Sequence, residues 1–112
     1  MNTSDFSRRE DIRKVTLDSG VTLLSQCVAD ALSVSVGAWV HTGSRDEGAG
    51  RYGITHFLEH MVFKGTGKRS ALDIALDMDR LGGQLDAFTT KEVTCFNARV
   101  LAGYLDTALD VL

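Results

Sequence analysis

The spacing of apolar residues predicts β-structure in the first 40 residues. Residues 14–17 and 21–25 are short apolar-rich runs on either side of residues 18–20 (Asp-Ser-Gly), which predicts a hairpin with glycine at the tight position. Residues 32–40 alternate apolar with small side chains and predict a strand with one strongly buried face. Residues 41–50 are rich in glycine, serine and charge and predict a loop.

The most apolar predicted helix begins near Tyr52 or Gly53 and runs to about Phe63. Five of its residues form a broad apolar stripe: Ile54, Phe57, Leu58, Met61 and Val62. A stripe of this width predicts a helix that is mostly buried. Residues 64–68 contain two glycines and are expected to break this helix.

The second half of the chain predicts another helix, one or two strands and a final helix. Ser70 is a favourable N-cap for a helix that runs through Leu81, and two glycines follow it. Residues 84–100 are rich in β-branched and aromatic side chains, which predicts one long strand or a bent pair. The last helical face is formed by Leu105, Ala108, Leu109 and Leu112. This order of elements predicts an α+β fold.

Length and charge narrow the class of protein. The 112 residues suffice for one small domain, in which we expect a flexible N-terminal segment at residues 1–12 and ordered structure over residues 13–112. A net charge of −3 argues against a nucleic-acid partner, and no apolar run reaches the roughly 20 residues of a membrane span. No export signal is found, which favours the cytoplasm and free, buried thiols at Cys27 and Cys95.

The motif H-x-x-E-H at residues 56–60 points to metal chemistry. On a helix, four residues turn the chain by about 400°, so His56 and His60 lie roughly 40° apart on one face. Two imidazoles at this spacing can hold one zinc ion, and Glu59 is placed to take a proton from an attacking water. The alternative is that both histidines are solvated or satisfied core residues and that Glu59 is a surface acid.

The residues around the motif extend the pattern. Residues 53–66 (Gly-Ile-Thr-His-Phe-Leu-Glu-His-Met-Val-Phe-Lys-Gly-Thr) closely resemble the active-site segment of the pitrilysin/insulinase family of zinc peptidases, which includes the mitochondrial processing peptidases. Residues 18–21, 36–47 and 82–89 resemble its opening hairpin, its first core strand with a G-S-R-x-E loop, and its G-G-x-x-N-A-F-T segment. The resemblance spans about residues 15–112. It implies a truncated metallopeptidase α/β sandwich domain of the processing-peptidase type, similar to that of bacterial zinc proteases.

The resemblance also implies roles for the motif residues. His56 and His60 correspond to zinc ligands and Glu59 to the general base, while the family's third ligand is a glutamate expected beyond Leu112. Three residues within the chain are candidates to replace that ligand: Glu92, His41 and Cys95. Each has an alternative that is purely structural: Glu92 on a solvated strand face, His41 in a loop and Cys95 in the core.

A further set of residues is implied in substrate binding. The family's "N-A-F-T" segment holds the peptide as an added strand, and here it contains Asp86, Ala87 and Phe88. An ionised Asp86 accepts hydrogen bonds but cannot donate one, so a bond to a peptide carbonyl is lost, whereas the backbone of Ala87 and Phe88 remains able to bind. Phe63 is implied to line the pocket beside the scissile bond, with plain helix-end core as its alternative.

These implications predict a zinc-dependent metalloendopeptidase that acts on a peptide or protein substrate. We expect the 112-residue chain to be an incomplete, inactive part of the catalytic domain. It would need the missing C-terminal part of the same protein, or a partner subunit. The alternative function is a non-catalytic scaffold or peptide-holding relative of the same fold. The charged residues of the loops, Arg69 included, are expected at the surface, with Arg45 and Glu47 as a possible brace for the start of the motif helix.

Overall fold

The computed structural model describes residues 12–112, which belong to two compact units with a boundary between Ala31 and Leu32. The flexible segment predicted for residues 1–12 lies outside the described residues, except for Ile12, which begins a strand. Within the described range, no helix has the length and apolar character needed to cross a membrane.

The first unit contains the predicted hairpin. Strand β1 (Ile12–Thr16) pairs antiparallel with β2 (Thr22–Gln26). Gly20 occupies the tight position with φ of 88°, a left-handed conformation that favours glycine, and its N–H donates to the carbonyl of Leu17 at 2.8 Å. Cys27 follows β2 and is exposed, so the prediction that both thiols are buried is wrong for this residue, although both are free.

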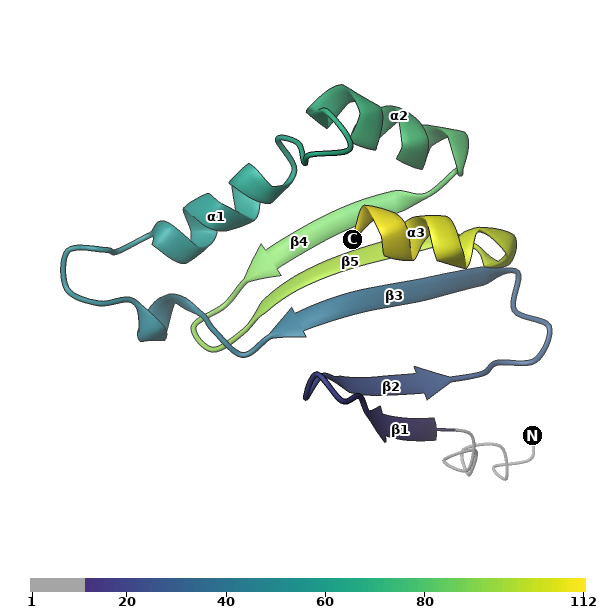
Figure 1. Ribbon diagram of the computed structural model, residues 1–112, viewed down its shortest axis with the longest axis horizontal. Helices are drawn as coiled ribbons and strands as arrows, with labels where there is room; N and C mark the ends of the chain where they lie inside the picture. The colour runs from purple at the N-terminus through teal and green to yellow at the C-terminus, as the bar shows by residue number, and fades with distance from the viewer. Residues whose placement is uncertain (1–11) are drawn as a thin grey trace, which may run out of the picture. The chain divides into compact units, whose positions relative to one another are not determined.

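The second unit is built on a three-stranded antiparallel sheet in the order β3-β5-β4 (Figure 1). Its strands are β3 (Ser33–Val40), β4 (Gln84–Thr89) and β5 (Thr94–Leu101). Residues 84–100 therefore form the bent pair of strands and not one long strand. The turn between β4 and β5 is closed by the N–H of Thr90, which donates to the carbonyl of Val93 at 2.8 Å.

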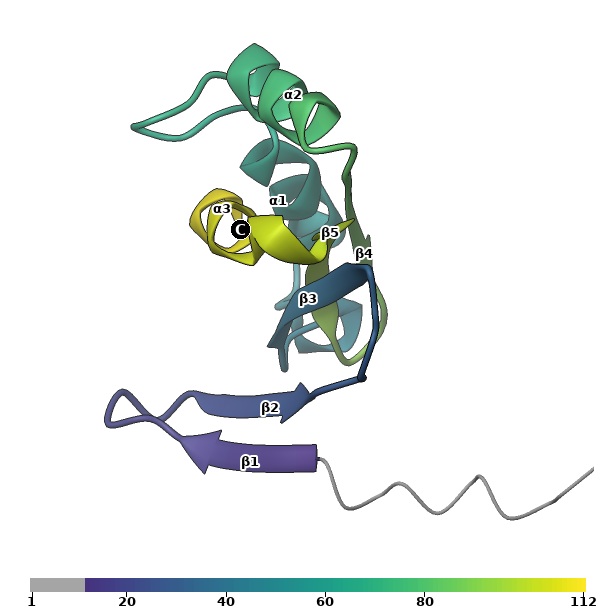
Figure 2. The same ribbon diagram turned by 90° about the vertical axis from the view of Figure 1, so that its right-hand side faces the viewer.

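Three helices lie on the same side of this sheet (Figure 2). They are α1 (Ile54–Val62), α2 (Ala71–Arg80) and α3 (Leu105–Val111). Short 3-10 turns, η1 (Ser44–Asp46) and η2 (Ala102–Tyr104), lie in the connections that follow β3 and β5. The sheet and helices confirm the predicted α+β class.

Helix α2 begins where its sequence predicts. The hydroxyl of Ser70 accepts the N–H of Asp73, and the carboxylate of Asp73 accepts the N–H of Ser70, which completes a capping box. The Ser70 hydroxyl also donates to this carboxylate and is the main reason that the pKa of Asp73 is lowered. The inner face of α2 buries Ile74 and Met78.

The core of the second unit lies between the sheet and helices α2 and α3. Its buried members are Met78, Ala98, Val100 and Ala108. Gly83 allows α2 to approach the sheet closely, because a Cβ at this position would lie 2.8 Å from Val100 Cγ1 and 2.9 Å from Met78 Cε. Val111, half-buried, also packs against this core, whereas Leu109 and Leu112 are exposed, so the predicted face of the last helix is wrong at these two positions.

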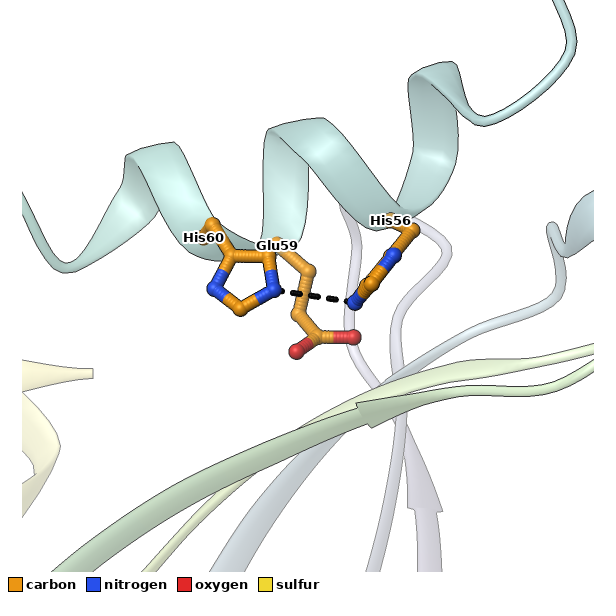
Figure 3. Close-up of side chains that lie close together, drawn as sticks. All are labelled: His56, Glu59 and His60. Atoms are coloured by element: carbon orange, nitrogen blue, oxygen red, sulfur yellow. Dashed lines mark hydrogen bonds between the residues drawn. The ribbon is translucent and has the colours of Figure 1, made fainter.

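Two further burial predictions are wrong. None of the residues of α1 is buried, and Phe57 and Leu58 are 61% and 54% exposed. The reason is that α1 turns its histidine and glutamate side chains toward the sheet, which leaves part of its apolar stripe outside (Figure 3). The inner face of β3 is likewise only half-buried, at Val34 and Val36.

Arg69 is not a loop-surface residue, contrary to expectation. Its side chain is 19% exposed, and Nε donates to Asp77 Oδ2 at 2.9 Å while Nη2 donates to Asp110 Oδ2 at 2.7 Å. The guanidinium therefore connects α2 to α3. The same contact holds the pKa of Asp110 below its usual value.

Candidate functional site

The helix that carries the motif is capped by a residue outside it. Gly53, at the N-cap of α1, has φ of 86° and no side chain to accept the free N–H groups of the first turn. Glu47 accepts them instead, from Gly53 N at 2.7 Å and Thr55 N at 3.1 Å. These backbone donors lower the pKa of Glu47. The brace expected from Arg45 and Glu47 is thus confirmed for Glu47, whereas Arg45 pairs with Glu92.

The segment before α1 rests on the β4–β5 turn. The N–H groups of Ser44 and Arg45 donate to the carbonyls of Thr90 and Lys91, each at 3.0 Å. Gly43 is required for this approach, because a Cβ there would lie 2.4 Å from the backbone of Thr90 and Lys91. The start of α1 is therefore tied, through η1, to the end of β4.

The motif residues converge in space. His56 Nε2 and His60 Nε2 are 2.9 Å apart, and their ring centroids are 4.6 Å apart at an angle of 57° (Figure 3). One possible ligand atom from each of His56, Glu59 and His60 lies within 4.8 Å of the other two. Both histidines are exposed and Glu59 is half-buried, so the cluster is open to solvent on the histidine side.

This donor set fits a zinc ion. Tetrahedral zinc with Zn–N distances near 2.05 Å separates two ligand nitrogens by about 3.3 Å. The observed 2.9 Å is a few tenths of an ångström shorter, a difference that small rotations of the two rings remove. Among residues 12–112, this is the one group of three His, Cys, Asp or Glu side chains with such spacing.

The carboxylate of Glu59 has a partner that sequence reasoning missed. Thr89, the last residue of β4, donates its Oγ1–H to Glu59 Oε2 at 2.6 Å. Alternation along β4 turns Leu85, Ala87 and Thr89 toward the helices, while Gln84, Asp86 and Phe88 are exposed. That alternation, which is visible in the sequence, was the signal that could have placed Thr89 on the side of the motif.

The other predicted site residues lie around this cluster. Phe63 is half-buried at the C-cap of α1, its ring 6.3 Å from that of Phe96 in an edge-on arrangement. Asp86, Ala87 and Phe88 lie on β4, an edge strand of the described sheet. Asp86 Oδ1 accepts the N–H of Ala87 at 2.8 Å, so this backbone donor is already engaged. The structure thus places Phe63 at the end of α1 and β4 against the same helix.

None of the alternative third ligands joins the cluster within residues 12–112. Glu92 lies in the β4–β5 turn, not on a strand face as expected, and pairs with Arg45. His41 is exposed just after β3. Cys95 is buried in β5, and this burial raises the pKa of its thiol.

Comparison with known proteins identifies the family. The sequence profile of Insulinase (Peptidase family M16) matches residues 22–112. An uncharacterized zinc protease of Streptomyces coelicolor is 48% identical over 101 residues, which are 90% of this chain and 22% of that protein. A probable mitochondrial-processing peptidase subunit beta of Arabidopsis thaliana is 38% identical over 102 residues, which are 91% of this chain and 19% of that protein.

A solved structure agrees with this assignment. The crystal structure of a protease from Helicobacter pylori superposes with a TM-score of 0.84 at 30% identity, over 89% of this chain and 24% of that one. The chain thus spans about a fifth to a quarter of the length of these relatives. The resemblance and fold class inferred from sequence are confirmed, and the chain belongs to the insulinase family of peptidases, peptidase family M16.

Proposed function

We propose that the natively produced protein carrying this chain (the native protein) is a zinc-dependent metalloendopeptidase in which His56 and His60 are metal ligands. The proposal depends on one observation, the 2.9 Å separation of the two Nε2 atoms with Glu59 in the same cluster. Relatives named as zinc proteases support the reaction class. When bound, zinc supplies a Lewis acid that polarises a peptide carbonyl and acidifies water.

Glu59 is the general base in this proposal. Thr89 holds Oε2, which leaves Oε1 to accept a proton from the attacking water. The same carboxyl group then delivers this proton to the nitrogen of the leaving amine as the peptide C–N bond breaks. Half-burial of Glu59 supports the role, because it limits proton exchange with bulk solvent between the two transfers.

The substrate peptide lies along β4 as an added strand in this proposal. An edge strand offers its backbone to an added strand, and Ala87 and Phe88 would provide it once the N–H of Ala87 exchanges its bond to Asp86 Oδ1 for one to the peptide. Phe63 lines a shallow pocket of about 290 Å³ between α2 and β4 that suits an apolar side chain. The other residues that line it are Ala71, Ile74, Ala75, Met78, Asp79, Gly83 and Leu85.

The 112-residue chain by itself is proposed to be inactive. Residues 13–112 would be the N-terminal part of the catalytic domain, and a catalytic zinc site generally needs three protein ligands. Two histidines without a third ligand would bind zinc weakly, and turnover would be negligible. The third ligand would come from a C-terminal part of the native protein or from a partner subunit.

Glu59→Gln in the native protein tests the proposal, because it removes the base and keeps the shape of the side chain. We expect turnover of a peptide substrate to fall about 10³-fold or more while zinc content, measured by inductively coupled plasma mass spectrometry, stays at the wild-type value. Glu92→Gln is the matched control, since it removes the same charge from the β4–β5 turn and should leave both quantities unchanged.

Two results would contradict this assignment. Loss of zinc from Glu59→Gln would make Glu59 a ligand and not the base. Unchanged turnover, or no turnover in the wild-type protein with any peptide, would favour the non-catalytic scaffold or peptide-holding relative.

A further inference from the structure

A side-chain hydrogen bond joins the sheet to the cluster of His56, Glu59 and His60. Thr89 Oγ1 lies 2.6 Å from Glu59 Oε2, the short distance typical of a hydroxyl that donates to a carboxylate. The two residues are 30 positions apart and come from β4 and α1. Glu59 is thereby fixed by a residue outside its own helix.

The hydroxyl of Thr89 is held in place by the backbone around it. Thr89 is opposite Thr94 at the last register position of the β4–β5 pair, and the turn that follows is closed by Thr90 and Val93. The η1 segment packs on this same turn. A β-branched side chain at the end of a paired strand has few rotamers available, so the donor is preorganised.

We infer that Thr89 is a positioning residue that holds one carboxylate oxygen of Glu59 away from the metal. This inference rests on the proposed role of Glu59 as the base. A carboxylate whose oxygen lies within 4.8 Å of both histidine nitrogens could otherwise turn and coordinate the cation. By engaging Oε2, Thr89 keeps Glu59 as a proton acceptor beside the ion.

Thr89→Val in the native protein tests this role, because valine keeps the branched shape and loses the hydroxyl. We expect kcat to fall about 10- to 100-fold with little change in KM, the effect of removing one hydrogen bond to a charged group. Thr89→Ser, which restores the donor, should recover most of kcat. Thr22→Val is the control for the type of substitution, because Thr22 is an exposed threonine of the hairpin.

Crystal structures of the metal-free and cobalt-substituted variants give a readout that does not depend on turnover. In Thr89→Val we expect the Glu59 carboxylate to leave the position it has in the wild-type protein and, with cobalt bound, to approach the ion. The visible spectrum of the cobalt protein should change accordingly, since it reports the number of ligands.

Three results separate the possible failures. If Glu59→Gln abolishes turnover but Thr89→Val leaves both kcat and the Glu59 position unchanged, the inference is wrong and the proposed function stands. If Thr89→Val lowers kcat and thermal stability together and Thr89→Ser rescues neither, Thr89 is structural and the inference is again wrong. If Glu59→Gln retains turnover, the proposed function itself fails.

Discussion

The carboxylate of Glu47 accepts the backbone N–H of Gly53 at 2.7 Å and so supplies the cap that a glycine cannot provide. Because His56 lies in the first turn of the same helix, this contact also bears on the position of the His56, Glu59 and His60 cluster. Glu47 directly follows η1 in the chain. The η1 segment is in turn bound to the β4–β5 turn, because the N–H of Ser44 donates to the carbonyl of Thr90. The start of α1 and the end of β4 are thus positioned by one connected set of contacts.

Glu47→Gln should lower the melting temperature of the native protein in a pH-dependent way. The pKa of Glu47 is lowered from its usual 4.5 by the two backbone donors, so its stabilising effect is complete above that pH and is lost as the pH falls through the lowered pKa. Thermal melts between about pH 3 and pH 7 should show a gap between wild type and variant at neutral pH that closes in acid. A gap that is constant with pH would contradict the role of the ionised carboxylate.

Gly43→Ala should detach η1 from the β4–β5 turn. The new Cβ would lie 2.4 Å from backbone atoms that cannot rotate away, so we expect a loss of about 1–3 kcal/mol of unfolding free energy, measured by urea denaturation. Gly48→Ala is the control, because no atom lies within 4 Å of its Cβ position. Equal stabilities of the two variants would mean that the close contact at Gly43 is not rigid.

Arg69→Gln should destabilise the association of α2 with α3. This guanidinium binds Asp77 and Asp110 at once and is 19% exposed, whereas Lys68 is 79% exposed and approaches Asp110 only to 3.5 Å. We therefore expect a clear fall in melting temperature for Arg69→Gln and almost none for Lys68→Gln. Similar effects of the two substitutions would show that the Arg69 contacts contribute no more than an exposed ion pair.

Asp86→Asn should improve the binding of a peptide to β4. The Asp86 carboxylate now engages the N–H of Ala87, and an amide oxygen is a weaker acceptor while the amide NH₂ can donate to a peptide carbonyl. We expect KM for a peptide substrate to fall about 3- to 10-fold with kcat nearly unchanged. Asp106→Asn on α3 is the matched control, and an unchanged KM in Asp86→Asn would argue against substrate binding at this edge.

Local sequence signals predicted the elements that local interactions determine. Ser70 and Asp73 are three residues apart and form a capping box, and the four-residue spacing of His56 and His60 directly placed both rings together. The hairpin followed from Gly20 for the same reason. In each case the residues that decide the structure are neighbours in the chain.

Contacts between residues far apart in the sequence were not predicted. The hydrogen bond between Thr89 and Glu59 joins residues 30 positions apart, and that between Arg69 and Asp110 joins residues 41 positions apart. The apolar stripe of α1 predicts a buried face, but periodicity shows only which side chains share a face and not whether another element covers it. Phe57 belongs to this stripe and is nevertheless exposed.

Zinc bound per chain in histidine variants of the native protein is the most direct test of the proposed metal centre. The chain has three histidines, and His41 lies outside the cluster. We predict one zinc per chain by native mass spectrometry for the wild type and for His41→Ala, and its loss in His56→Ala and in His60→Ala. Zinc retained at full stoichiometry in either of the last two variants, with the fold intact by circular dichroism, would contradict the assignment.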